Sequence, residues 1–198
     1  MRTAVALVAA VLMTTAWTAV AQEPKAPGRS ADAAKIARAM SAAPPEIARK
    51  AAIIDVTADG TIKQLRTGTN GWVCMTDGDG IPMCLDKEWQ GWADAWIAKK
   101  DPQIKNVGIA YMLKGDKGAS NTDPYAEKAT PDNQWVVSGP HVMILTPDVA
   151  MLDALPTDPN NGGPWVMWKG TKYAHIMVPT APMPKQAAKK TPTKPASK

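Results

Sequence analysis

The only two histidines of the chain occur in the same local frame. The two segments read HVMI from position 141 and HIMV from position 175, so a methionine follows each histidine by two positions. Residues two apart in a β-strand share a face, so each segment would present an imidazole beside a thioether. This soft ligand set favours Cu(I) over hard cations. If the two strands lie close together, the sequence predicts a copper site made of His141, Met143, His175 and Met177.

Two other interpretations of this frame stay open. It resembles the paired His-hydrophobic-Thr-hydrophobic motifs of two-histidine phosphoesterases, in which one imidazole acts as base, the other as acid, and the hydroxyls hold phosphate. Here Met143 and Met177 replace the hydroxyls, and a thioether cannot donate a hydrogen bond to phosphate. A hydrolase-like enzyme using His141 or His175 is the first alternative. The second is a plain core, in which the methionines pack and the histidines are hydrogen-bonded.

The chain has two cysteines, Cys74 and Cys84. An even count in a chain with an export signal predicts a disulfide. Their spacing is not Cys-x-x-Cys and no histidine lies near them, which argues against a thiolate metal or redox site. The pair is therefore expected to be structural.

The N-terminal residues 1–21 are typical of a secretory signal peptide. Arg2 precedes an uncharged stretch that ends in a small-x-small cleavage site, Ala19-Val20-Ala21. No later stretch reaches the roughly 18 apolar residues needed to span a bilayer. The sequence thus predicts a periplasmic or secreted protein with no transmembrane segment in the mature chain.

The net charge of +5 is unevenly distributed. Residues 51–184 carry eleven basic and fifteen acidic side chains, a net charge of −4, whereas residues 185–198 carry five lysines and no acid. The folded part therefore has no basic footprint, and no nucleic-acid partner is expected. The Lys/Pro/Ala stretch at 183–198 predicts a disordered tail. Such a tail either solubilises the protein or touches anionic envelope polymers and lipid headgroups, as in a structural envelope-associated protein.

The elements that would position these residues form one α+β domain at 44–182, after a linker and an Ala-rich helix at 22–43. Hairpins are predicted over 53–66, 135–145 and 165–178, and a long loop over 114–133. The first hairpin is expected to continue as a meander into a third strand at 72–74. The clearest helix runs from Asp86 to Lys100, where apolar residues recur at helical spacing. The fold class expected is an antiparallel sheet of hairpins packed against this Trp-rich helix.

Three tryptophans share the apolar face of that helix: Trp89, Trp92 and Trp96. Because the chain has no phenylalanine, these indoles are expected to supply the bulk of the core. The alternative is a platform on which a sugar ring stacks.

Five segments of the chain resemble exported bacterial proteins of similar length. They are GTNGWVC at 68–74, PMCLD at 82–86, SNTDPY at 120–125, GPHVM at 139–143 and YAHIMVP at 173–179. The likeness covers about residues 42–180 and implies an exported domain with this cysteine pair and with the His-Met segments as family features. It carries over no catalytic role. The expected function is therefore non-enzymatic binding of a small ligand or a metal such as copper.

Overall fold

A computed structural model of the chain describes residues 27–184, so the predicted signal peptide and nearly all of the predicted tail lie outside the described residues. The strands of the main sheet are β1 Ala52–Val56, β2 Ile62–Arg66, β3 Val73–Thr76, β4 Pro82–Leu85, β5 Gly108–Met112, β8 His141–Leu145, β9 Trp165–Met167 and β10 His175–Pro179. Two short strands, β6 Ala119–Ser120 and β7 Trp135–Val136, form a separate ladder. The helices are α1 Pro27–Met40, α2 Pro45–Ala48, α3 Lys87–Ile97 and the 3₁₀ helix η1 Val149–Leu152.

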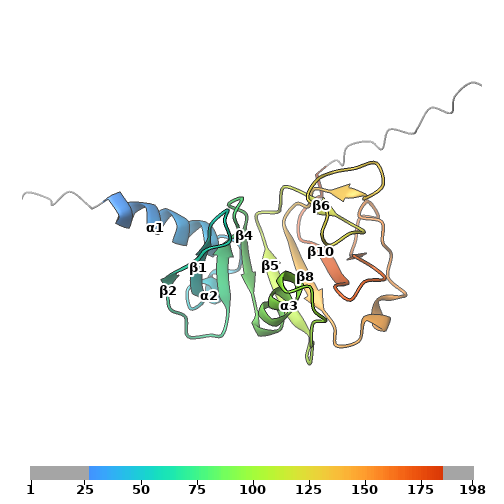
Figure 1. The fold of residues 1–198 in the computed structure, drawn as a ribbon, viewed down its shortest axis with the longest axis horizontal. Coiled ribbons are helices and arrows are strands. Elements are labelled where there is room, and N and C mark those ends of the chain that lie inside the picture. Colours follow the sequence, from blue (N-terminus) through green and yellow to red (C-terminus); the bar gives the residue numbers. More distant parts are fainter. Residues whose placement is uncertain (1–26, 185–198) are drawn as a thin grey trace, which may run out of the picture.

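The eight main strands lie side by side in the order β2-β1-β3-β4-β5-β8-β10-β9 (Figure 1). Every neighbouring pair is antiparallel except β1 and β3. The predicted fold class, an α+β domain with a Trp-bearing helix on an antiparallel sheet, is confirmed. Among residues 27–184, no helix is long and apolar enough to cross a membrane.

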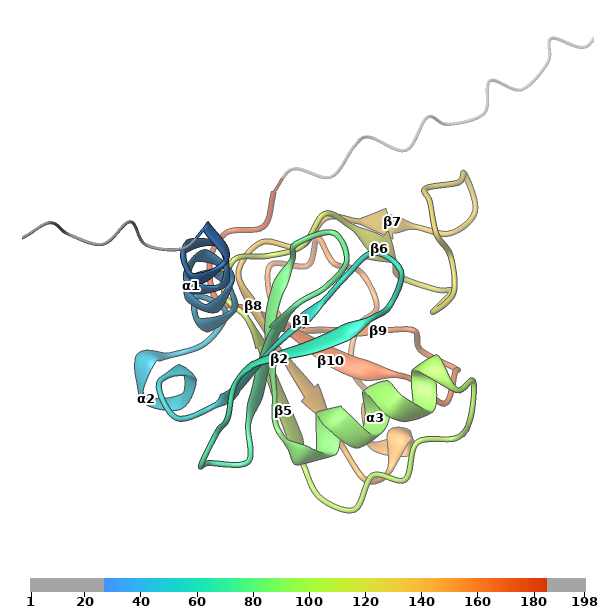
Figure 2. The ribbon, with the colours of Figure 1, turned by 60° about the vertical axis from the view of Figure 1, so that its left-hand side comes forward.

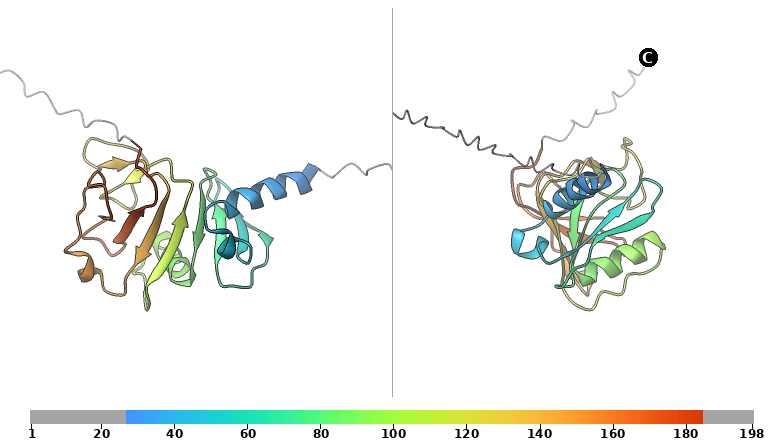
Figure 3. Two further views of the ribbon diagram at one scale, coloured as in Figure 1. Left: turned by 180° about the vertical axis from the view of Figure 1, so that it is seen from behind. Right: turned by 90° about the vertical axis from the view of Figure 1, so that its left-hand side faces the viewer.

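The helices cover the two faces of the sheet (Figure 2). Cys84 points to the face on which α1 and α2 pack, where its neighbours are small side chains such as Ala39 and Ala48. Leu85, the next residue, points to the opposite face and joins the cluster that includes Trp89 and Trp92 of α3. The first turns of α1 extend past the end of the sheet, as the views in Figure 3 show.

One side chain joins α3 to the sheet. Asp86 is the N-cap of the helix, and its Oδ1 accepts a hydrogen bond from the backbone N–H of Trp89 at 2.9 Å. Its Oδ2 accepts a second hydrogen bond from the N–H of Ile109 on β5 at 2.5 Å. This carboxylate therefore fixes where the helix begins and which strand it lies against.

The structure corrects two details of strand pairing. β3 pairs with β1 in parallel instead of continuing a meander from β2, because the chain turns back directly over β1. A Cβ at Gly68 would lie 2.1 Å from the backbone nitrogen of Ala52, so only glycine allows this close passage. Strand β4, which directly precedes α3, was not expected from the sequence.

The second correction concerns the hairpin predicted over 135–145. β7 pairs with β6, and β8 pairs instead with β5 and β10. Gly118 has a φ of +112°, and its missing side chain leaves room for the indole of Trp135, whose Nε1 would otherwise lie 2.1 Å from a Cβ. The predicted loop over 114–133 therefore folds back on residues 135–136.

The predicted disulfide between Cys74 and Cys84 is present and buried. The two residues face each other on β3 and β4, so the bond closes the hairpin that turns at Asp77–Gly80. Both sulfur atoms lie in the cluster beneath α1. The bond therefore joins two neighbouring strands within the core.

Reducing this disulfide is expected to lower the free energy of unfolding by about 3 kcal/mol, because the unfolded chain regains the entropy of a closed loop of about ten residues. Urea unfolding of the oxidised and reduced protein measures the difference. The double variant C74A/C84A is the control, since reductant should not shift its curve. Equal midpoints for the oxidised and reduced wild type would contradict the expectation.

Candidate functional site

One face of the main sheet is lined by methionines, and we call it the methionine face. Six of the nine methionines in residues 27–184 lie on it: Met75, Met83, Met112, Met143, Met167 and Met177. Both histidines lie on the same face. α3 covers one end of it, so these side chains form most of the core between helix and sheet.

Strand register places the four predicted ligands. Met143 on β8 is directly opposite Met177 on β10, and both are buried. His141 is opposite Pro179, four residues along β10 from His175, which corresponds to about 13 Å along the strand. The structure therefore brings the two thioethers together in the middle of the strand pair and places the two histidines on either side of them along the strands.

The methionine face has an approximate twofold arrangement about the Met143–Met177 pair. Each histidine has one methionine across from it on its outer neighbour strand, which is Met112 for His141 and Met167 for His175. Each histidine also has one methionine of the central pair two residues along its own strand and the other diagonally across on the neighbouring strand. Both positions are within reach of long side chains. The face thus holds two half-sites, each made of one imidazole and three thioethers.

The His141 half-site extends further along the sheet. Met112 is opposite His141, and the register of β4 and β5 carries the same row on through Met83 to Met75. Opposite residues on neighbouring strands have Cβ atoms about 5 Å apart. One cross-strand row therefore contains three methionines and one histidine.

Both imidazoles are held in the same tautomer. His141 donates its Nδ1–H to the carbonyl of Gly139 at 2.7 Å, and His175 donates its Nδ1–H to the carbonyl of Tyr173 at 3.0 Å. A carbonyl oxygen can only accept, so Nδ1 carries the proton and Nε2 keeps its lone pair. Within residues 27–184, neither buried Nε2 has a hydrogen-bond partner.

Burial keeps both rings neutral at physiological pH. It lowers the pKa of His175 to about 4, and the charge of His141 lowers it further, while the bond to the Tyr173 carbonyl acts in the opposite direction. Burial also lowers the pKa of His141, against the raising effects of the Gly139 carbonyl and the charge of Asp116. A neutral imidazole with a backbone-bound Nδ1–H and a free Nε2 is the form in which histidine binds metals.

The two half-sites differ in their surroundings. The ring of His175 is enclosed by three indoles: Trp89 at 5.3 Å, Trp92 at 5.7 Å and Trp168 at 5.0 Å between ring centres, each nearly perpendicular to it. Trp168 is held there with a φ of +57°, its indole N–H donating to the Ser120 carbonyl at 2.6 Å. Aromatic side chains therefore occupy the space around His175.

The indoles near His175 continue into a column of parallel rings that reaches the surface. Trp168 stacks on Trp92, Trp92 on Trp96, and Trp96 on Tyr125, with interplanar angles of 4°, 4° and 7°. Tyr125 is the exposed end, and its hydroxyl donates to that of Tyr173 at 2.8 Å. Trp89 and Trp92 of α3 are thus buried in the core, as the sequence predicted, and Trp96 packs beside them half-buried.

The partners of the two ring nitrogens bear on the hydrolase alternative. Across the described residues, no hydroxyl or carboxylate lies within hydrogen-bond distance of a ring nitrogen of His141 or His175. Asp116, which affects the pKa of His141, accepts from the backbone N–H groups of Gly118 and Ser138 through Oδ1. A general acid or base would need such a partner or a water path to substrate.

The same part of the chain contains no group of three or more His, Cys, Asp or Glu residues able to hold a metal ion. A metal on the methionine face would therefore depend on thioether sulfur. The chain matched no family model, no curated protein and no solved structure.

Sequence reasoning missed Met75, Met83, Met112 and Met167 as members of the site. A signal for two of them exists: Met75 follows Cys74 and Met83 precedes Cys84. Once the cysteines are paired across two strands, alternation puts both methionines on the other face. No comparable signal marks Met112 and Met167, because the pairing of β5 and β9 is not encoded locally.

The depressed pKa of His175 predicts a pH dependence of stability. In the unfolded chain the imidazole of His175 becomes protonated below about pH 6.5, whereas in the folded protein it becomes protonated only near pH 4. The free energy of unfolding should therefore fall as the pH drops through this window, by up to about 3 kcal/mol. In H175Q this part of the decline should be absent. Urea unfolding of both proteins at pH 7 and pH 4.5 measures it, and the same decline in both would contradict the assignment.

Proposed function

We propose that the chain is an exported, non-enzymatic binding protein for a soft metal ion, with Cu(I) as the ion that suits its donors. The main support for this proposal is the buried Nε2 of His141, which has no hydrogen-bond partner among residues 27–184 and lies on a face rich in thioethers. Imidazole and thioether are the ligands that select Cu(I), and their neutral charge suits a monovalent ion in an apolar site.

The proposed site is the His141 half of the methionine face. Its ligands are Nε2 of His141 and the sulfur atoms of Met112, Met143 and Met177. Methionine has three rotatable bonds, so these sulfur atoms can turn toward an ion without movement of the strands. The carbonyl of Gly139 accepts the Nδ1–H of His141 and thereby orients the imidazole, as metal-binding histidines usually require.

The His141 half is favoured over the His175 half by what surrounds each ring. Three indoles fill the space around His175, whereas the row beside His141 continues into the half-buried thioethers of Met83 and Met75. A bound ion at His141 therefore has further sulfur donors toward the solvent. Met143 and Met177 belong to both halves, and His175 acts in this proposal as a core residue.

Export supports the same function. The buried Cys74–Cys84 disulfide is typical of proteins outside the reducing cytosol, and the signal-like N-terminus agrees with this. An exported protein meets copper ions before these ions are bound inside the cell. The lysine-rich C-terminal stretch would add weak association with anionic envelope polymers or lipid headgroups.

Competition with a Cu(I)-specific chromogenic chelator under anaerobic conditions tests the proposal. The wild-type protein is expected to withdraw one Cu(I) per chain at His141. H141Q and M112L should each weaken binding by about tenfold or more, because each removes one ligand. Met→Leu conserves volume, so the fold of M112L should be retained.

Two matched controls accompany these variants. M151L removes the exposed sulfur of η1, which is outside the methionine face, and should bind as the wild type does. H175Q removes the other imidazole and should also retain binding. A wild-type protein that leaves the chelator complex intact would overturn the proposal, and so would equal losses in H141Q and H175Q.

A further inference from the structure

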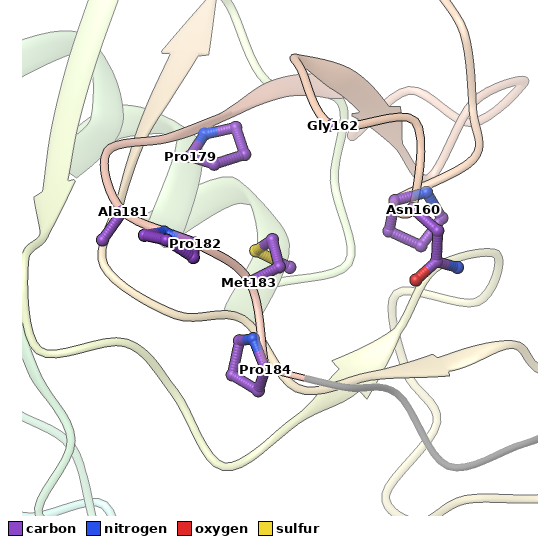
Figure 4. A pocket seen from close by; sticks show the side chains of 8 residues that line it. Asn160, Gly162, Pro179, Ala181, Pro182, Met183 and Pro184 are labelled. Atoms are coloured by element: carbon purple, nitrogen blue, oxygen red, sulfur yellow. The ribbon is translucent and has the colours of Figure 1, made fainter.

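A surface cavity of about 540 Å³ opens beside the His141 end of the methionine face. Its walls are formed by the end of β10, the segment that follows it, and the loop around Asn160 across from them (Figure 4). Pro179, which lines the cavity, is the residue directly opposite His141 in the strand register. The cavity therefore lies one residue across the sheet from the proposed copper ligand.

The segment at 180–184, which we call the C-terminal strap, lines this cavity and packs against the residues that precede His141. It continues along the β8 side of the sheet, where the N–H of Thr180 donates to the carbonyl of Pro140 at 2.9 Å. The strap also packs on Gly139, where a Cβ would be 3.2 Å from Cδ of Pro184 and 3.3 Å from the Pro182 carbonyl oxygen. The carbonyl of Gly139 is the one that holds the His141 ring.

Met183 of the strap lies between the cavity and the core. It lines the cavity, is half-buried, and packs against the core cluster that contains Met112, Met143 and Met177. Those three sulfur-bearing side chains are themselves buried. Met183 is thus a thioether that lines the cavity and also packs on the core cluster to which the proposed methionine ligands belong.

The cavity walls around Met183 provide few other donor atoms that could bind a metal ion in place of its sulfur. Four of the lining residues are prolines, whose side chains carry no donor atom, and none of the described residues that line the cavity has a carboxylate. A hard cation would find few ligands there, whereas a monovalent soft ion can exchange its carrier ligand for the Met183 sulfur.

We propose that Met183 is the entry ligand for Cu(I), which is taken up at this cavity and passed to His141. This inference rests on the proposed function. Each transfer is a ligand exchange: one Cu–S or Cu–N bond forms as the bond to the previous ligand breaks, and copper remains Cu(I). Met183 therefore controls how fast the ion enters, while Met112 and His141 set how tightly it is held.

Stopped-flow transfer of Cu(I) from its bicinchoninate complex separates these two roles. M183L removes the sulfur and keeps the volume, and it is expected to slow uptake by about fivefold or more while the equilibrium affinity stays near that of the wild type. M151L serves as the control, because it removes an exposed sulfur that is not part of the cavity lining, and should load at the wild-type rate. M112L should show the converse pattern, a loss of affinity.

A second variant tests the path without removing sulfur. G139A would press a methyl group against Pro182 and Pro184, displace the strap, and thereby speed both uptake and release. Wild-type rates in both M183L and G139A would overturn the inference while leaving the copper site intact. Equal losses of affinity in M183L and M112L would also overturn it, since Met183 would then be an equilibrium ligand. Failure of the wild type to take up Cu(I) would instead refute the proposed function itself.

Discussion

The antiparallel register of β8 and β10 is the constraint on which the rest of the core depends. It sets Met143 opposite Met177 and thereby places the two histidines on either side of this buried pair along the strands. A shift of one residue would turn every one of these side chains to the other face of the sheet. The hydrogen bonds from Nδ1 to the carbonyls two residues earlier then decide which nitrogen of each ring faces the core. Position and tautomer thus follow from backbone geometry alone.

Much of the architecture could be predicted because it is encoded locally. The helical spacing of Trp89, Trp92 and Trp96, the hairpin at 53–66 and the hairpin at 165–178 each depend on residues close in sequence. The parallel pairing of β1 with β3 could not be predicted in this way, because it depends on a close passage at Gly68 that no periodicity marks. The pairing of β7 with β6 could not be predicted for a similar reason. It depends on the fit of the Trp135 indole against Gly118, and these two residues are separated by a loop.

The candidate site was predictable only in part, for the same physical reason. Alternation along a strand correctly indicates that His141 lies beside Met143 and His175 beside Met177. How far apart two such strands place their histidines is a matter of register between distant segments, and the sequence alone does not specify it. The outer methionines, Met112 and Met167, enter the site through β5 and β9, whose neighbours are likewise set by tertiary pairing.

A sulfur-lined core also makes the fold sensitive to oxidation. Conversion of a thioether to its sulfoxide adds a polar oxygen, which the apolar space beneath α3 could not accommodate. The most deeply placed of these residues, Met177 and Met167, are shielded by burial, while Met75 and Met83 at the outer end of the row are half-exposed. Peroxide would therefore reach the outer sulfur atoms before the inner ones. In an oxidising environment these two methionines would therefore be converted to sulfoxides before those of the interior.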